Sequence, residues 1–177
     1  AAAPHRDRGI AITFDMTATP EASGMPEIPR RPEIIHGVRN LVQNAVDFAQ
    51  SNVWIEATWT QSLIRVLVVD DGPGYPPHML DRIGEPYLRN RRVDKRPAYD
   101  GMGLGLFIAK TLLERTGATI RFANCTGRRV PPGFAGERCG AIAEVSWPRS
   151  EIEANPRAVL GENPKFDAAT VGSGNTL

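Results

Sequence analysis

Two asparagines in a stretch of helical periodicity are the first residues of this sequence that could hold a metal ion. Asn40 and Asn44 are four residues apart, so they share one face of the predicted helix, and Asp47 lies near that face. An Asn amide oxygen is a neutral, hard ligand suited to Mg²⁺, which completes its coordination shell with waters and phosphate oxygens. The alternative for this pair is a polar, solvated helix face.

A second group of polar residues follows a hydrophobic run, in the sequence Asp-Asp-Gly-Pro-Gly at 70–74. The carboxylate of Asp70, at the end of a strand, can accept a hydrogen bond from an exocyclic amine such as that of adenine. Gly72 and Gly74 allow positive φ and a close approach of the backbone to a ligand. An ordinary strand-ending turn is the alternative, since Asp-Gly and Pro-Gly are common turn pairs.

A third stretch, GMGLGL at 101–106, opens a predicted helix. Free N–H groups at a helix start bind phosphate, and glycines let the phosphate come near. The alternating glycines follow a charged loop, which does not fit the dinucleotide-binding fingerprint, and Lys110-Thr111 lacks the glycine that a P-loop requires before it. A glycine-rich hinge without a ligand is the alternative.

A basic tract precedes this glycine-rich stretch, with five cationic residues among the eight at 89–96. These residues are Arg89, Arg91, Arg92, Lys95 and Arg96. Beside a phosphate-binding helix start, the tract predicts a lid that covers phosphates. A solvated loop is the alternative.

Periodicity and alternation predict the elements that must position these residues. They are strands at 9–15, 52–59, 63–69, 118–124 and 140–147, a helix beginning near Pro32, a short helical stretch at 76–83 and a helix over 103–115. Strands joined by short turns pair antiparallel, and two helices must cover one face, so we expect an α+β two-layer sandwich with 9–15 as an edge strand. Residues 1–150 form the expected domain, and 151–177 a polar tail.

Composition excludes several classes of protein for this stretch. Its 177 residues suit one domain, and a net charge of +1 gives no argument for a nucleic-acid partner. No apolar run approaches the roughly 20 residues of a membrane helix, and no signal peptide is found, so we expect that this fragment requires no membrane contact. Two cysteines, Cys125 and Cys139, are too few for a disulfide framework, and they are either ordinary thiols or a redox-sensitive pair.

The order of these pieces resembles the catalytic ATP-binding domain of sensor histidine kinases, in the superfamily that includes gyrase, Hsp90 and MutL. Residues 40–45 resemble the N box, 70–74 the G1 box, 85–89 (EPYLR) a variant F box and 101–106 the G2 box. The stretches NLVQNAVDFA and GMGLGLFIAKTLLERTGA are most similar to the redox-sensing kinases of the RegB/PrrB/ActS type. The resemblance implies a Bergerat-type fold, with a mixed, mostly antiparallel sheet covered on one face by helices.

The resemblance also implies a role for each matching residue. Asn44 would be a catalytic residue and the ligand of the Mg²⁺ that bridges the ATP phosphates, with Asn40 supporting the same site. Asp70 would accept the adenine amino group, and Gly72 and Gly74 would let the base approach. ATP and Mg²⁺ are therefore the expected ligands.

At the phosphate end, the family pattern implies that Arg89 is a catalytic residue facing the γ-phosphate, with Arg91 or Arg92 beside it. The G2 residues implied in nucleotide binding are Gly101, Gly103, Leu104 and Gly105. ATPases of the superfamily carry a Glu where Asn40 stands, which activates the attacking water, so Asn40 favours phosphoryl transfer over hydrolysis. Asp47 departs from the pattern, because many histidine kinases carry Lys or Arg there.

The phosphoacceptor histidine of the family lies in a segment reading about His-Glu-x-x-x-Pro, and none of His5, His36 or His78 has that context. We therefore expect the acceptor on a separate dimerisation domain of the same kinase, with a response regulator downstream. The fragment is expected in the cytoplasm, in a parent protein anchored in the inner membrane by segments absent here. An ATP-hydrolysing member of the superfamily and a non-catalytic nucleotide-sensing module are the alternatives.

Overall fold

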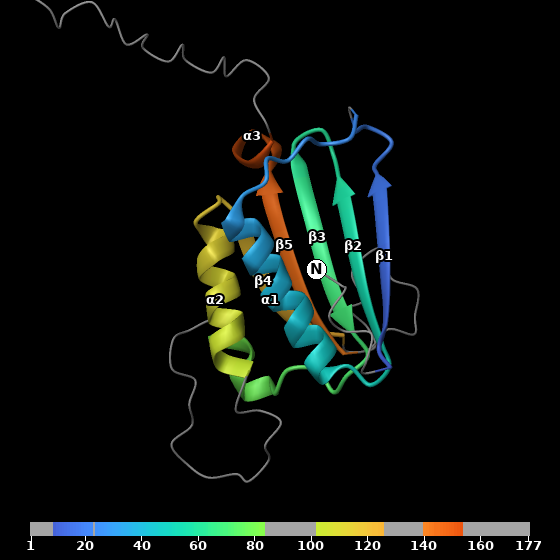
Figure 1. Cartoon of the computed structure of the whole chain (residues 1–177), viewed down its shortest axis with the longest axis vertical. Coiled ribbons are helices and arrows are strands. Elements are labelled where there is room, and N and C mark those ends of the chain that lie inside the picture. The colour runs from blue at the N-terminus through green and yellow to red at the C-terminus, as the bar shows by residue number, and fades with distance from the viewer. Residues whose placement is uncertain (1–8, 23, 84–101, 126–139, 154–177) are drawn as a thin grey trace, which may run out of the picture.

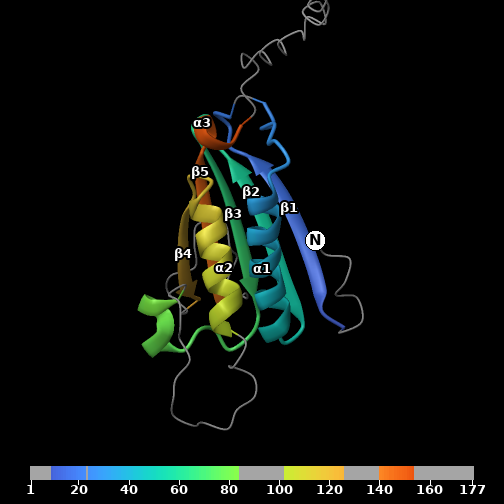
Figure 2. The same cartoon turned by 60° about the vertical axis from the view of Figure 1, so that its left-hand side comes forward.

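The computed structural model describes residues 9–22, 24–83, 102–125 and 140–153, which form a sheet and a helical layer (Figure 1 and Figure 2). The strands are β1 (Ala11–Ala18), β2 (Asn52–Trp59), β3 (Leu63–Asp70), β4 (Thr119–Asn124) and β5 (Ala141–Pro148). The helices are α1 (Pro32–Phe48), α2 (Met102–Glu114), the short α3 (Arg149–Ile152) and the 3-10 helix η2 (Pro77–Arg82). Every predicted element is found, with its ends shifted by a few residues at most, and α3 is the element that was not predicted.

The five strands form one sheet in the order β1-β2-β3-β5-β4. Strand β1 lies at an edge and runs parallel to β2, from Ala11 opposite Asn52 to Ala18 opposite Trp59. The parallel direction follows from the long connection through α1, which returns the chain to the end where β1 begins. The other neighbours, β2–β3, β3–β5 and β4–β5, are antiparallel. The prediction of a mixed, mostly antiparallel sheet with helices on one face is confirmed.

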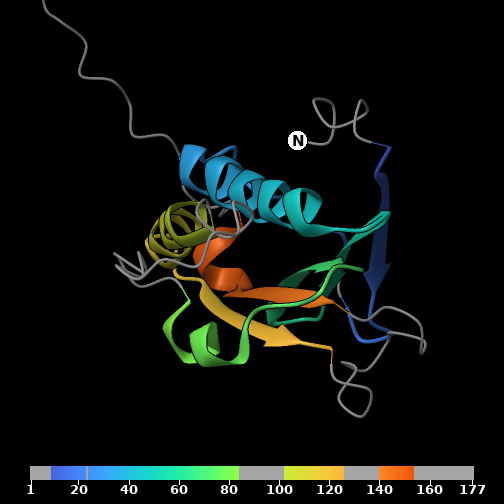
Figure 3. The ribbon, with the colours of Figure 1, turned by 90° about the horizontal axis from the view of Figure 1, so that it is seen from below.

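The helical layer forms because α1 and α2 each bury one apolar face. Helix α1 begins at Pro32, whose fixed φ suits the first turn, and buries Leu41, Val42, Ala45 and Val46. Figure 3 shows α1 and α2 side by side on one side of the sheet. Gly37 lets the two helices approach, since a Cβ there would lie 2.5 Å from Cγ of the buried Leu113.

Strand β3 is apolar on both faces, which suits its central position in the sheet. Ile64 and Val68 belong to the core beneath the helices, whereas Leu67 and Val69 belong to a smaller buried cluster with Ile142 and Cys125. Its second half, from Leu67 to Asp70, is therefore buried on both sides. Cys125 is buried, and Cys139 lies outside the described residues.

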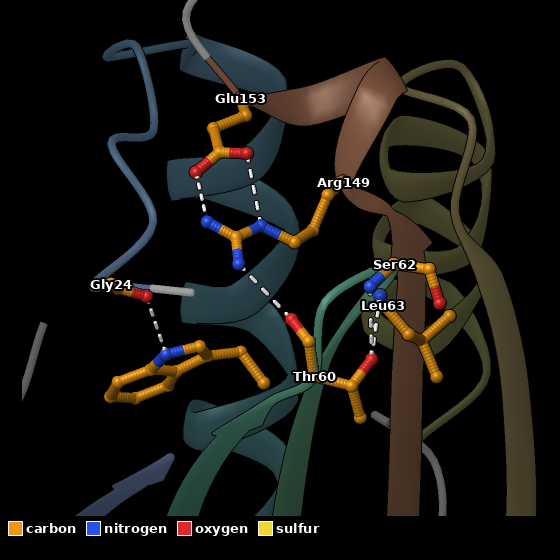
Figure 4. A network of polar contacts seen from close by, with 7 residues as sticks. Gly24, Thr60, Ser62, Leu63, Arg149 and Glu153 are labelled. Atoms are coloured by element: carbon orange, nitrogen blue, oxygen red, sulfur yellow. Dashed lines mark hydrogen bonds and ion pairs between the residues drawn. The ribbon is translucent and has the colours of Figure 1, made fainter. Parts of the chain in front are cut away.

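The end of the sandwich that holds α3 is fixed by a network of polar contacts (Figure 4). Arg149 donates from Nε to Glu153 at 2.9 Å and from Nη2 to the other carboxylate oxygen, while its Nη1 donates to the Thr60 carbonyl at 3.1 Å. The Arg149 guanidinium holds the pKa of the Glu153 carboxyl below its ordinary value. Ile152 is fully buried, so the packed domain continues just beyond residue 150.

The opposite end gathers three elements that carry the residues singled out by the sequence. The end of α1, the end of β3 and the start of α2 all lie at the lower end in Figure 1.

Among the described residues, no helix combines the length and the apolarity that crossing a bilayer requires.

Candidate functional site

Asp70 is a buried carboxylate at the end of β3, with 3% of its surface exposed. Its Oδ1 accepts hydrogen bonds from the backbone N–H groups of Gly72 at 2.8 Å and Ala141 at 3.2 Å. Burial raises the pKa of Asp70, although these two hydrogen bonds oppose the change. Its Oδ2 accepts no hydrogen bond from the described part of the chain, so this oxygen is available to a donor from a ligand.

Two glycines make the space around this carboxylate. A Cβ on Gly140 would lie 2.2 Å from the carbonyl oxygen of Asp70 and 2.5 Å from its Oδ1. A Cβ on Gly72 would lie 2.2 Å from the carbonyl oxygen of Phe48, the last residue of α1. Gly72 is therefore required for contact between the G1 turn and α1. Gly140 was not predicted, because a glycine before a strand carries no signal of a contact 70 residues away.

Asp71, which the sequence marked only as part of a motif, joins the end of β3 to the connection between α1 and β2. Its carboxylate accepts hydrogen bonds from the backbone N–H groups of Gln50 at 2.8 Å and Ser51 at 3.0 Å, and from Asn52 Nδ2 at 2.9 Å. Burial alone would raise the pKa of Asp71, but these hydrogen bonds outweigh it and hold the pKa below its ordinary value. The carboxylate thereby fixes α1 relative to Asp70.

The glycine turn ends in a tyrosine whose backbone is held by β4. Gly74 has φ +78°, and Tyr75 donates from its N–H to Asn124 Oδ1 and accepts from Asn124 Nδ2, both at 2.6 Å. The ring of Tyr75 is buried and meets Phe122 edge to face at 5.8 Å. Burial, together with the negative charge of Asp70, raises the pKa of the Tyr75 hydroxyl far above its ordinary value.

Asn40 and Asn44 lie half-buried on α1, and neither amide makes a hydrogen bond with the described residues. Asn44 is one turn before Phe48, so it lies toward the end of α1 that packs on Gly72. Asp47 is exposed, and Gln43 Nε2 donates to it at 2.9 Å along the helix. Both asparagines are therefore available as neutral oxygen ligands.

Helix α2 begins at Met102, so Gly103 and Gly105 belong to its first turn. A Cβ on Gly105 would meet no atom within 4 Å, and the side chain of Leu104 is 69% exposed. The first N–H groups of a helix have no partner within it and carry a partial positive charge. The Leu104 side chain is thus directed to solvent, whereas Arg89, Arg91, Gly101 and the F box lie outside the described residues.

The structure thus brings together Asp70, Gly72, Gly74 and the ends of the helices that carry Asn44 and Gly103. The end of α1 and the start of α2 present helix dipoles of opposite sign at the same end of the sandwich. That end therefore suits a cation beside α1 and an anion beside α2. Asp70 adds an oxygen that can accept a hydrogen bond from an amine. An adenine nucleotide with a divalent cation matches this set of groups.

Comparisons with known proteins agree with this geometry. The family described as histidine kinase-, DNA gyrase B- and HSP90-like ATPase matches residues 30–150. The chain is 53% identical over 170 residues to sensor histidine kinase RegB of Cereibacter sphaeroides, which covers 92% of this chain and 36% of RegB. It is 31% identical over 138 residues to the histidine-protein kinase/phosphatase MprB of Mycolicibacterium vanbaalenii, covering 73% of this chain and 26% of MprB.

Solved structures share the fold. A mycobacterial sensor histidine kinase MprB has a TM-score of 0.56 at 22% identity, covering 81% of this chain and 88% of that one. The catalytic domain of histidine kinase ThkA has a TM-score of 0.57 at 21% identity, covering 81% and 83%. The chain spans about a third of the length of RegB. It belongs to the histidine kinase-, DNA gyrase B- and HSP90-like ATPase family, an ATP-binding family, as a catalytic domain of the sensor histidine kinase type.

Proposed function

We propose that this domain binds MgATP at the end of the sandwich that holds Asp70, and that it donates the γ-phosphoryl group to a histidine on a separate helical dimerisation domain. The observation that carries the proposal is the buried carboxylate of Asp70, with one oxygen fixed by two backbone N–H groups and the other available. A buried carboxylate with a raised pKa costs stability, which favours a functional reason for its presence.

In this proposal the free oxygen of Asp70 accepts the adenine amino group and orients the base. Asn44, with Asn40 one turn before it, supplies amide oxygens for Mg²⁺ near the cation-favouring end of α1. When bound, Mg²⁺ supplies charge neutralisation for the phosphates. The first turn of α2, with Gly103 and Gly105, receives the phosphates at its positive end.

Phosphoryl transfer to histidine requires positioning and charge neutralisation, because a neutral imidazole already carries a lone pair. A water nucleophile would require a carboxylate to activate it. The superfamily pattern puts a glutamate for that purpose where this chain has Asn40. Kinase activity is therefore favoured over hydrolysis. We extend the proposal to Arg89 and Arg91, which would face the γ-phosphate.

The proposal includes the partners of the whole protein. The phosphoryl group would pass from the histidine to an aspartate of a response regulator, in a two-component pathway of the redox-sensing type. The parent protein would be anchored in the inner membrane by segments outside this sequence, with this domain in the cytoplasm. The similarity to RegB over 92% of the chain supports these extensions.

Transfer in trans tests the proposed reaction. The chain is mixed with ATP labelled on the γ-phosphate, Mg²⁺ and the helical histidine domain of the same kinase. We expect acid-labile, base-stable label on the histidine domain, and none when its acceptor histidine is replaced. Steady release of phosphate without any histidine domain would favour the ATPase alternative. ATP binding with neither transfer nor hydrolysis would favour a nucleotide-sensing module.

A further inference from the structure

Asn124, the last residue of β4, fixes the backbone of the turn that follows Asp70. Its side-chain amide accepts from the N–H of Tyr75 and donates to the carbonyl oxygen of the same residue, both at 2.6 Å. Only one orientation of the amide satisfies both contacts, because an Asn amide has one donor end and one acceptor end. Both backbone groups of Tyr75 are therefore held by one side chain that is distant in sequence.

The glycine turn packs closely against the Asn124 amide. A Cβ on Gly74 would lie 2.8 Å from Asn124 Oδ1 and 2.9 Å from its Cγ, and the φ of +78° is itself strained for any residue with a Cβ. The ring of Tyr75 packs against Phe122, which also belongs to β4. Strand β4 therefore holds both the backbone and the side chain of the residue that ends the glycine turn.

The end of β4 is also connected to the other side of Asp70. The N–H of Cys125 donates to the carbonyl oxygen of Gly140 at 2.9 Å, and Gly140 is the residue packed against Asp70. The next residue, Ala141, donates to Asp70 Oδ1. Asn124 and the residue that follows β4, Cys125, thus reach the two sides of the proposed adenine site, Asn124 through the glycine turn and Cys125 through Gly140.

From these contacts we infer that Asn124 is a positioning residue for recognition of the adenine base, which acts through Tyr75 and the glycine turn without contacting the nucleotide. The inference rests on the proposed role of Asp70. With the amide in place, the turn at 72–74 keeps one conformation and the free oxygen of Asp70 faces the amino group of the base. Without it, the turn relaxes, and the domain loses discrimination for the amino group while it keeps its contacts with the phosphates.

The test compares dissociation constants, measured by calorimetry with the full chain, for ATP and for purine riboside triphosphate, which lacks the amino group. Asn124→Ala should lower the ratio of the analogue's dissociation constant to that of ATP at least about threefold below the wild-type ratio, because part of the hydrogen bond to the amine is lost. Thr60→Ala is the matched control. It likewise removes two hydrogen bonds between a side chain and the backbone: the N–H groups of Ser62 at 3.1 Å and Leu63 at 3.0 Å donate to Thr60 Oγ1, at the opposite end of the sheet.

Thr60→Ala should lower the unfolding temperature and leave the ratio unchanged. If Asn124→Ala does not fold, Asn124→Asp keeps the acceptor for the Tyr75 N–H and loses the donor, and it should show a smaller fall in the ratio. An unchanged ratio in the folded Asn124 variant, with ATP and the analogue weakened equally, would show that Asn124 is merely structural. A wild-type chain with no preference for ATP would instead refute the proposed role of Asp70.

Discussion

Replacement of Asp70 by Asn or by Ala separates the structural task of this carboxylate from its proposed task in adenine recognition. Asn keeps an oxygen in the place of Oδ1, which accepts from Gly72 and Ala141, and removes the buried negative charge. Ala leaves both backbone N–H groups without their acceptor. The two variants should therefore differ in stability but share a loss of adenine recognition.

The expected magnitudes follow from these contacts. A buried donor without a partner costs roughly 1–3 kcal/mol, so Asp70→Ala should lower the free energy of unfolding by about 2–4 kcal/mol after relief of the buried charge is subtracted. Asp70→Asn should leave that free energy unchanged or raise it at pH 7. In ATP binding, loss of a hydrogen bond to a charged acceptor is worth about 1.5–3 kcal/mol, or roughly a 10- to 150-fold weaker affinity.

The pH dependence has a definite sign. Because the pKa of Asp70 is raised in the folded state, the folded chain binds the proton more tightly than the unfolded chain. The contribution of Asp70 to stability is therefore fully present below its ordinary pKa of 3.8 and is lost as pH rises through the folded pKa. Relative to Asp70→Asn, the wild type should lose stability as pH rises from 3.8 toward neutrality.

Urea unfolding followed by circular dichroism, and calorimetric titration with ATP and purine riboside triphosphate, measure both effects. Equal destabilisation by Asn and Ala would refute the view that an oxygen in the place of Oδ1 is sufficient to satisfy the two backbone donors. Equal weakening of ATP and of the analogue would refute the contact between Asp70 and the adenine amino group.

Four further substitutions test the parts around Asp70 and the start of α2. Asn44→Ala should abolish the difference in ATP affinity between Mg²⁺ and EDTA, which calorimetry measures; a retained Mg²⁺ effect would exclude Asn44 as the ligand. Asp71→Asn should lower the free energy of unfolding by about 1–2 kcal/mol at pH 7. Because the pKa of Asp71 is lowered, the difference from the wild type should shrink as pH falls below 3.8. Urea unfolding that shows the same difference at pH 3 as at pH 7 would contradict the assigned hydrogen bonds. Gly140→Ala should lower the free energy of unfolding by about 2–3 kcal/mol, because the added Cβ is overpacked against Asp70. Gly105→Ala has open space around its Cβ and should leave the free energy of unfolding unchanged or raise it by up to about 1 kcal/mol. Equal unfolding temperatures for the two alanine variants would show that Gly140 is not tightly packed.

Local patterns were sufficient to predict the elements and to select candidate residues for the site. Runs of β-favouring residues at 52–59 and 63–69 predicted β2 and β3, and helical periodicity after Pro32 predicted α1. Asn40, Asn44 and Asp70 could be proposed as site residues because each stands in a local motif whose residue type suits a ligand. The side chain of Leu104 is exposed because it projects from the first turn of α2, away from the core that the helix covers.

Contacts between distant segments could not be predicted from the same patterns. Asn124 ends a short strand and Gly140 precedes another, and nothing near either residue reveals Tyr75 or Asp70 as its partner. A glycine within a helix is expected to lower its stability, and the packing role of Gly37 follows only from its contact with Leu113 of α2. These roles depend on strand order and helix packing, which a local sequence pattern does not encode.

The most direct test of the central claim is to locate bound nucleotide by amide NMR of the isotope-labelled chain. Addition of MgATP should shift the amides of Gly72, Ala141 and Gly105, and leave those near Thr60 and Arg149 at the opposite end unchanged. Inorganic tripolyphosphate with Mg²⁺ should shift Gly105 but not Ala141, because it has no base. MgATP shifts that are absent at Ala141, or that centre on the end with Arg149, would contradict the assignment of the adenine site to Asp70.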